Sequence, residues 1–285
     1  MQVRKAVITA AAPNQNRLPL QQLVCRQGED KTALQLIVDE TIAAGVEEIC
    51  VVIKPGDQNA YESAAGSHLG NLRFVEQPEP KGYADAIYQA KEFVGNDPFM
   101  HLVGDHLYLS KNEVPCAKQL VQVAAEHECS VSAVQSTREN KLPYFGIISG
   151  THVPRHEGVY EVERVVEKPT PTFAEQELVT PGLRAGHYLG FFGIHVLTSD
   201  VMTVIGELLA SSPKDKPTLS DALWQLGKRQ RYLAFEVQGT RYNLGVQYGL
   251  LIAQLAIGLS GRHRDSILTE MVELLANRSE AVIKS

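Results

Sequence analysis

The chain has 285 residues, a length that favours one elaborated α/β domain over two separate domains. Hydrophobic residues make up 44% of it and charged residues 21%, which is an ordinary globular composition and excludes a disordered or collagen-like chain. With 27 basic against 33 acidic residues the net charge is −6, so nucleic acid is not expected as a main partner. No apolar run has the length of a signal peptide or of a membrane-spanning helix, so we expect no membrane partner.

The cysteines do not have the paired C-x-x-C spacing of zinc fingers and redox dithiols; they stand at Cys25, Cys50, Cys116 and Cys129. We therefore expect reduced, mostly buried thiols and a cytoplasmic protein. His101, Asp105 and His106 are not interpreted as a zinc site. On a strand, residue 106 points away from the face that residues 101 and 105 share.

The N-terminal half alternates strand and helix patterns. Short apolar runs predict buried strands at residues 3–9, 48–53, 72–75, 99–103 and 130–134. Apolar residues at helical spacing predict helices at 32–44, 83–94 and 114–125, the first of them ended by Gly45. This alternation predicts βαβ units and a largely parallel sheet.

Beyond about residue 140 the strand patterns follow one another without long helices between them. Strands are predicted at 144–148, 159–166 and 187–196, as antiparallel additions to the sheet, and helices at 199–209, 219–228, 246–259 and 266–275. The apolar stretch 250–259 is interpreted as core or as a subunit interface, so a homo-oligomer is among the expected assemblies. Ligands bind beyond the carboxyl ends of parallel strands, which directs attention to the loops at 9–31, 76–86, 104–108, 167–186 and 238–245.

Several segments share an order along nearly the whole chain: residues 4–11, 30–40, 43–49, 77–82, 94–105, 166–169, 185–188, 219–222 and 239–242. Together they resemble the sugar-1-phosphate nucleotidyltransferases, and most of all the bacterial UTP–glucose-1-phosphate uridylyltransferases. The resemblance implies a Rossmann-like α/β fold with a mixed, mostly parallel central sheet flanked by helices. It also implies a single domain over 1–285, with a nucleotide-binding half at 1–140, a sugar-binding half at 141–262 and a C-terminal helix at 263–285.

The reaction that the resemblance implies is nucleotidyl transfer, with sugar 1-phosphate, UTP and UDP-sugar as the small-molecule partners. An oxygen of the sugar phosphate attacks the α-phosphorus of UTP, and pyrophosphate leaves. Negative charge accumulates on the phosphate oxygens, so catalysis requires cations and backbone N–H groups around them. The family supplies these with a glycine-rich loop, a lysine and Mg²⁺ held by two aspartates.

The resemblance also assigns roles to individual residues. The implied catalytic residues are Arg17, Asp105 and Lys168, and the implied metal positions are Asp105 and Asn243. The implied substrate-binding residues are Ala12, Gln77, Gly82, Gly146, Glu167, Lys168 and Gly186. Gln77 and Gly82 match base-reading positions, whereas Glu167 is placed to accept from sugar hydroxyls and Lys168 to meet the sugar phosphate.

The phosphate loop departs from the family pattern, because Ala12, Pro13 and residues 14–16 stand where the glycines are expected. Glycine allows the close backbone approach that a phosphate needs, and proline removes an N–H donor. The catalytic lysine falls on Leu20 or Leu23, depending on the register, and both are apolar.

The second metal aspartate is replaced by Asn243, which has no charge to offer Mg²⁺. Two interpretations therefore stay open. The chain is a uridylyltransferase with weak or absent catalysis and a weak or lost Mg²⁺ site, using Arg17, Arg26 or Lys81 as substitute cations. Alternatively, it is a catalytically inactive homologue, a pseudoenzyme that binds sugar nucleotide or acts as a regulatory partner.

Overall fold

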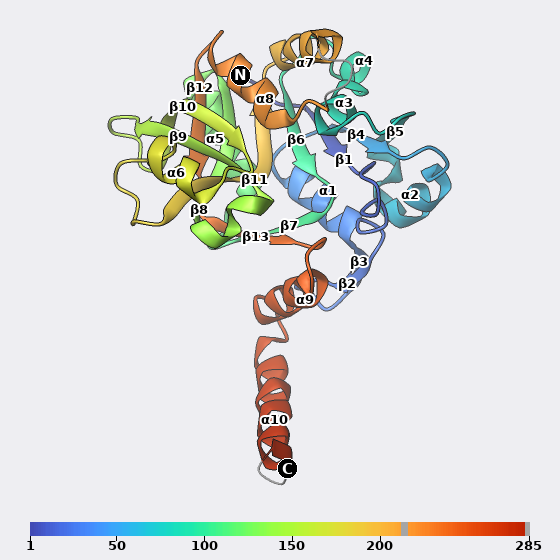
Figure 1. The fold of residues 1–285 in the computed structure, drawn as a ribbon. Helices are drawn as coiled ribbons and strands as arrows, with labels where there is room; N and C mark the ends of the chain where they lie inside the picture. Colours follow the sequence, from blue (N-terminus) through green and yellow to red (C-terminus); the bar gives the residue numbers. More distant parts are fainter. Residues whose placement is uncertain (212–215, 283–285) are drawn as a thin grey trace.

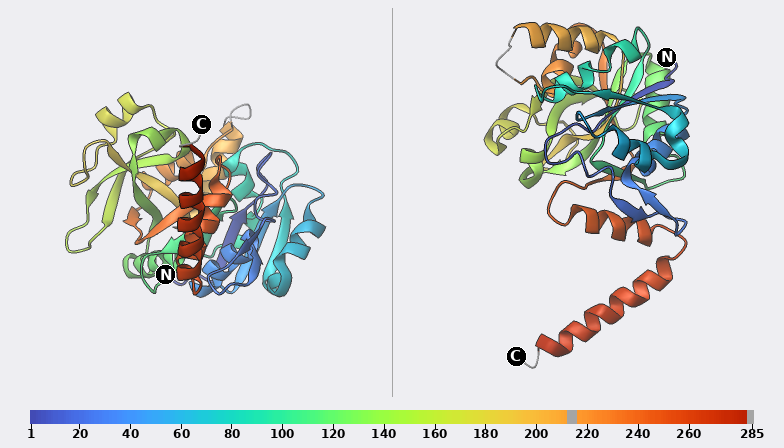
Figure 2. Two further views of the ribbon diagram at one scale, coloured as in Figure 1. Left: turned by 90° about the horizontal axis from the view of Figure 1, so that it is seen from below. Right: turned by 90° about the vertical axis from the view of Figure 1, so that its right-hand side faces the viewer.

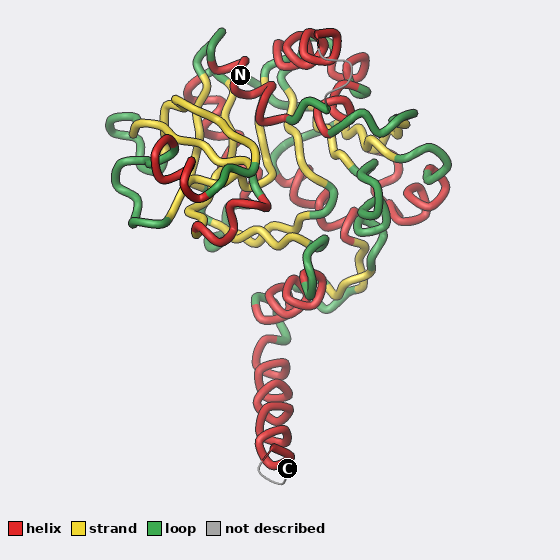
Figure 3. Tube along the Cα trace, in the orientation of Figure 1, coloured by secondary structure: helices red, strands yellow, loops and turns green. Residues whose placement is uncertain are grey.

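The structure is a computed structural model, and it describes residues 1–211 and 216–282. Within these residues a nine-stranded sheet forms the centre of the molecule, with the strand order β5-β4-β1-β6-β11-β8-β12-β10-β9 (Figure 1). Helices cover both faces of this sheet (Figure 3). In the same described part of the chain, β13 pairs with β7 and β2 pairs with β3 in two small separate sheets.

The N-terminal half builds the parallel end of the sheet. Its strands, all parallel to one another, are β1 (Lys5–Thr9), β4 (Glu48–Ile53), β5 (Leu72–Glu76) and β6 (Phe99–Val103). The helices between them are α1 (Ala33–Ala43), α2 (Gln58–Ala65), α3 (Tyr83–Tyr88) and α4 (Lys91–Val94). Helix α1 begins where the Thr32 and Gln35 side chains form a reciprocal capping box, which satisfies two N–H groups at the helix start. The predicted helix at 83–94 is interrupted between α3 and α4.

The second half adds strands of both directions. They are β8 (Ser130–Arg138), β9 (Gly146–His152), β10 (Val159–Glu167), β11 (His187–Leu197) and β12 (Tyr232–Glu236). Strand β11 is antiparallel to β6, β8 and β9, and β10 is antiparallel to β9 and β12. Because β12 is parallel to β8, only β10 and β11 of the described strands in this sheet run against the others. The predicted mixed, mostly parallel sheet is confirmed.

The two faces of the sheet bury separate apolar clusters, and successive residues of a strand alternate between them. In β1, Ala6 and Ile8 belong to one cluster and Val7 to the other. The first cluster includes residues of α1 and of α5 (Cys116–His127). The second includes residues of α3, α7 (Asp200–Ser211) and α8 (Leu219–Gly227). The strands are therefore buried on both faces, which explains their continuous apolar runs.

Several elements differ from the sequence predictions. Residues 139–144 form the 3-10 helix η2 (Glu139–Tyr144), so β9 begins at Gly146 rather than at residue 144. A loop is expected around Pro171, but Thr170 caps helix α6 (Pro171–Glu177) with Pro171 in its first turn, a position that suits proline. The other elements that the sequence did not predict are α2, β12, the 3-10 helix η1 (Gly66–Asn71), β2 (Gln22–Val24), β3 (Asp30–Thr32), β7 (His106–Ser110) and β13 (Gly239–Asn243).

The chain ends in two helices below the sheet, α9 (Gly249–Leu259) and α10 (Arg264–Val282). Helix α10 projects away from the body (Figures 1 and 2). It occupies most of the C-terminal helix predicted at 263–285, whose last three residues lie outside the described residues. Among the described residues, no helix combines the length and the apolar character that crossing a membrane requires.

Candidate active site

A cavity of about 840 Å³ opens where loops from both halves of the chain meet. Eight of the predicted site residues line it: Ala12, Gln77, Gly82, Asp105, Gly146, Glu167, Lys168 and Asn243. Among the described residues, Arg17 and Gly186 are outside this lining set, and both are exposed. The structure thus brings the predicted residues together from widely separated segments, with these two exceptions.

The loop that follows β1 is held closed by its own hydrogen bonds. The backbone N–H groups of Gln15 and Asn16 both donate to the Ala12 carbonyl at 3.1 Å. The Asn16 side chain donates to the Asp57 carboxylate at 2.5 Å, which anchors the loop at the start of α2. Asn14 takes the left-handed conformation, with φ of 66°, that asparagine tolerates. Two of the N–H groups in this turn therefore serve the loop itself.

Asp105 and Asn243 lie on one wall of the cavity. Strand β7 begins at His106, which is the register partner of Asn243 in β13, and the Leu244 N–H donates to the Asp105 carbonyl at 2.8 Å. His106 Nδ1 donates to Asp105 Oδ1 at 2.8 Å, and Asn243 Oδ1 accepts from the Gly245 N–H at 2.7 Å. Burial raises the pKa of Asp105, but the hydrogen bond and charge of His106 outweigh it, so the pKa of this carboxyl is lowered.

A second carboxylate, that of Glu167, lines the sugar-side part of the predicted site. Ser220 Oγ, in the first turn of α8, donates to Glu167 Oε2 at 2.5 Å. Lys168 Nζ lies 3.7 Å from Glu167 Oε1 and is more than half exposed. Gly146 leaves the room for this arrangement, because a Cβ there would lie 2.5 Å from Ser220 Oγ and 2.6 Å from Phe191 Cδ2.

The loop that resembles a base-reading segment is fixed to the start of α3. Gln77 is 6% exposed, and its Nε2 donates to the Gly82 carbonyl at 3.2 Å and to Asp85 Oδ2 at 2.6 Å. Gln89 Nε2 donates to the other Asp85 oxygen at 3.0 Å. Gly82 has φ of 121°, a conformation open to glycine. The loop is therefore held in place by hydrogen bonds of its own side chains.

Positive charge in the cavity comes from few residues. Of the described residues that line it, Lys168 and Lys216 carry the permanently charged amino groups. Leu23, one of the two positions expected for the catalytic lysine, is 3% exposed in the core. Arg26 does not substitute for that lysine, because its Nε donates to Ser260 Oγ at the end of α9. Lys81 pairs with the largely exposed Glu79 at 3.1 Å outside the lining set.

Arg241, from the segment that matches the second metal position, supports the wall instead of facing the cavity. It is 8% exposed, its guanidinium lies 3.6 Å from the centroid of the Phe145 ring, and it donates to the Phe191 carbonyl. Burial lowers the pKa of Arg241 to about 9. Its charge is used to hold Phe145 and β11 in place, and it does not add a cation to the cavity lining.

A buried polar network that the sequence did not reveal adjoins the cavity-lining residues Thr9, Tyr83 and His195. His101 Nε2 lies 3.3 Å from both Thr9 Oγ1 and the Tyr83 hydroxyl, and His195 Nδ1 lies 2.6 Å from Ser132 Oγ. Burial lowers the pKa of His195 to about 3 and that of His101 well below its usual value. Both imidazoles are therefore neutral at neutral pH and supply hydrogen-bonding groups rather than charge.

The sequence matches the model of one protein family, described as nucleotidyl transferase, over residues 16–245. This match spans most of the chain, and the chain belongs to the nucleotidyl transferase family. Within that family it is similar to bacterial UTP–glucose-1-phosphate uridylyltransferases. One from Streptococcus pyogenes is 30% identical over 278 residues, covering 87% of this chain and 86% of the relative. One from Streptococcus pneumoniae is 29% identical over 300 residues, covering 95% and 96%.

Solved structures agree with this relationship. A UDP-glucose pyrophosphorylase complexed with UDP-glucose has a TM-score of 0.72 and 25% identity, covering 90% of this chain and 98% of that one. The UDP-glucose pyrophosphorylase of Acinetobacter baumannii has a TM-score of 0.74 at 21% identity and supports the fold, covering 96% and 100%. The predicted family and Rossmann-like nucleotidyltransferase fold are confirmed.

Proposed function

We propose that the chain binds a UDP-sugar in this cavity, with UDP-glucose as the first candidate, and that its uridylyltransferase activity is weak or absent. The observation that carries the proposal is the uneven distribution of charged side chains in the cavity. Glu167 and Lys168 are charged, positioned side chains on the sugar side. The positions where the resemblance places the phosphate-binding glycines and the lysine hold Ala12, Pro13 and either Leu20 or the buried Leu23.

The sugar side has the groups that recognise a hexose phosphate. Glu167 keeps one oxygen engaged with Ser220, and its other oxygen, near Lys168, is available to a ligand hydroxyl. Lys168 is exposed enough to reach a phosphate, and a lysine ammonium binds phosphate as a point charge. Gln77 and Gly82 form a fixed loop beside them that fits a flat base.

The triphosphate side lacks comparable groups. Transfer of a nucleotidyl group needs charge stabilisation at the α-phosphate and at the leaving pyrophosphate. Two N–H groups of the loop after β1 are consumed by the Ala12 carbonyl, and Lys216 is the one other lysine among the described lining residues besides Lys168. The loss of a single preorganised contact of this kind typically costs about 3–4 kcal/mol of barrier.

The predicted Mg²⁺ position does not fit the ion well. Mg²⁺ demands octahedral oxygen coordination and favours carboxylates. Asp105 and Asn243 offer one carboxylate and one neutral amide, and one oxygen of each already accepts a hydrogen bond. We therefore propose that this site holds Mg²⁺ weakly or not at all.

We also propose that residues 1–140 form the nucleotide-binding half and residues 141–262 the sugar-binding half, as the resemblance implies. This division is supported by the cavity lining, to which both halves contribute. Gln77 and Asp105 come from the first half, and Gly146 and Glu167 come from the second. A cytoplasmic location also stays part of the proposal, and it is supported by four cysteines that are all free and buried.

Calorimetric titrations with UDP-glucose, UTP and glucose 1-phosphate, each alone, test the binding part of this proposal. We expect saturable binding of UDP-glucose and much weaker binding of UTP. Binding of none of the three would refute any sugar-nucleotide role. A pyrophosphate-release assay on the same preparation then separates a slow enzyme from an inactive, purely binding homologue, because both bind UDP-glucose and only the first turns over.

A further inference from the structure

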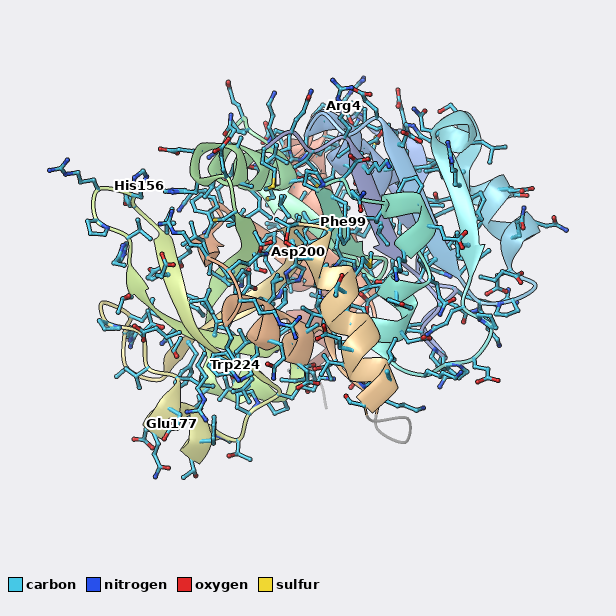
Figure 4. The ribbon with its side chains drawn as sticks, turned by 90° about the horizontal axis from the view of Figure 1, so that it is seen from above. Arg4, Phe99, His156, Glu177, Asp200 and Trp224 are labelled. Atoms are coloured by element: carbon cyan, nitrogen blue, oxygen red, sulfur yellow. The ribbon has the colours of Figure 1, made fainter. Side chains whose placement is uncertain are left out.

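A second group of ligating side chains lies outside the cavity, where the end of α5 meets the turn between β9 and β10. Glu126 and His127 are the last two residues of α5, and His156 lies in the turn. In the described part of the chain this is the one group of three or more His, Cys, Asp or Glu residues whose ligand atoms all lie within 4.8 Å of one another. Figure 4 shows His156 at the outer edge of the molecule.

The three side chains already stand near the spacing that a tetrahedral metal ion requires. Bonds of about 2.1 Å to nitrogen and oxygen put neighbouring ligand atoms about 3.4 Å apart around zinc. His156 Nδ1 lies 3.5 Å from Glu126 Oε1, and the rings of His127 and His156 have their centroids 4.6 Å apart at 65°. Small side-chain rotations therefore suffice to close the site.

One ligand atom in this group has no partner within the protein. His127 Nε2 is shielded from solvent and makes no hydrogen bond to any described residue. A buried polar atom without a partner typically costs about 1–3 kcal/mol, and such orphans in native structures often mark an absent ion or water. Each of the three residues offers a ligand atom within 4.8 Å of the other two, so one metal ion is within reach of all three side chains.

The electrostatic surroundings also accommodate a cation. The C-terminus of α5 carries the negative end of the helix dipole. Arg231 lies close enough for its charge to act on His127. Arg231 itself is paired with Glu161 at 3.1 Å, so its repulsion of a bound cation is reduced.

We propose that Glu126, His127 and His156 form a binding site for a divalent transition-metal ion of the zinc class, with water as the remaining ligand. Two imidazoles and one carboxylate are the donors that Zn²⁺ and its neighbours prefer, whereas Mg²⁺ prefers an all-oxygen site. The ion joins the end of α5 to the β9–β10 turn. The backbone of that turn is already fixed, because the His156 N–H donates to the Val153 carbonyl at 3.2 Å and the Val159 N–H to the His156 carbonyl at 3.3 Å.

The test is equilibrium dialysis of the full chain against Zn²⁺ after chelator treatment, with metal content read by mass spectrometry. We expect one Zn²⁺ per chain for the wild type and at least a tenfold loss of affinity in His156→Ala. His152→Ala is the matched control, since His152 is an exposed histidine of the same hairpin whose ring packs on Tyr160, and it should bind as the wild type does. Glu126→Gln, at an exposed position, should also weaken binding.

A spectroscopic measurement locates the ion independently of protein folding. Co²⁺ in place of Zn²⁺ should give the visible absorption of a four-coordinate site in the wild type, and His127→Gln should lose it while keeping the circular dichroism of the folded chain. Equal Zn²⁺ binding by the wild type and His156→Ala would overturn the proposal. So would loss of binding in Asp105→Asn alone, because that result would place the ion in the cavity.

Discussion

Ser220 Oγ donates a hydrogen bond of 2.5 Å to Glu167 Oε2, and so joins the first turn of α8 to the end of β10 beside the cavity. The two residues are 53 positions apart in the chain. The bond fixes one oxygen of the carboxylate, and the other lies 3.7 Å from Lys168 Nζ. A charged acceptor held in this way contributes both affinity and orientation, because it does not have to be ordered when the ligand arrives.

Glu167→Gln tests whether this carboxylate binds the sugar. We expect the Kd for UDP-glucose to rise about tenfold or more, equivalent to about 1.4 kcal/mol, because a charged acceptor becomes a neutral amide. Isothermal titration calorimetry measures the change. Glu163→Gln removes an exposed carboxylate from the same strand and should leave the Kd unchanged. Equal effects of the two variants would show that Glu167 acts only through net charge.

Gly146→Ala tests the close packing behind Glu167. The added methyl group would overlap Ser220 Oγ and the Phe191 ring, so the free energy of unfolding should fall by about 1–3 kcal/mol and UDP-glucose binding should weaken. Urea denaturation followed by circular dichroism gives the first quantity. At Gly70 a Cβ meets nothing within 4 Å, so Gly70→Ala should change stability by less than about 1 kcal/mol. A loss at Gly70 as large as that at Gly146 would contradict the packing argument.

Asn243→Asp tests the effect of a second carboxylate beside Asp105. A second carboxylate beside Asp105 should tighten Mg²⁺ binding at least tenfold, and pyrophosphate release should rise above the wild-type level. The rate should still stay low, because the loop after β1 and the apolar Leu23 are unchanged. Gln247→Glu adds the same charge to the cavity lining at another position and serves as the control. Unchanged Mg²⁺ affinity in Asn243→Asp would refute the claim that Asn243 weakens the Mg²⁺ site.

The buried histidines His101 and His195 make the free energy of unfolding depend on pH. The pKa of His195 is about 3 in the folded chain, and that of His101 is also lowered, whereas an exposed histidine titrates near 6.5. Between these values the unfolded chain binds the additional protons. The free energy of unfolding should therefore be constant above about pH 7 and fall as the pH drops from 6.5 toward 3, by up to about 1.4 kcal/mol per pH unit for each histidine.

Urea denaturation at intervals between pH 5 and pH 8 measures this slope. His195→Asn should reduce the slope without abolishing it, because His101 and His127, whose pKa values are also lowered, still contribute. His152→Asn should leave the slope unchanged, since His152 is exposed. Asp105 does not interfere in this range, because the stability that its lowered pKa contributes is lost only at more acidic pH. A slope that is the same in the wild type and in His195→Asn would contradict the burial of a neutral imidazole.

The main strands of the parallel half could be predicted from the sequence, whereas α2, β2 and β3 of the same half could not. Predicted strands at 48–53 and 99–103 coincide with β4 and β6, because strands buried on both faces leave uninterrupted apolar runs. Local patterns could not predict the pairing of β7 with β13, whose residues are far apart in the chain and partly polar. That pairing places Asn243 beside Asp105. The prediction that these two residues share a metal site therefore depended on the family resemblance.

In the candidate site, too, residues in recognisable segments could be predicted, whereas residues brought in by tertiary packing could not. Residues inside recognisable segments, such as Gln77 and Glu167, line the cavity. Arg26 was a candidate cation only by its nearness in sequence, and the hairpin of β2 and β3 carries it to the end of α9. Lys216 and His195 reach the cavity from positions with no distinguishing pattern. His127 and His156 come together only through the packing of α5 on the β9–β10 turn.

The most direct test of the central claim is a pyrophosphate-release assay with saturating UTP, glucose 1-phosphate and Mg²⁺. Enzymes of ordinary efficiency turn over at about 1–10³ s⁻¹, and each lost charge-stabilising contact costs about 10²–10³ in rate. We expect a rate at least about a hundredfold below 1 s⁻¹ from a preparation that binds UDP-glucose saturably. Turnover of 1 s⁻¹ or more would contradict the account, because the cavity would then stabilise the transferring phosphate without the glycines, lysine and second aspartate of the family.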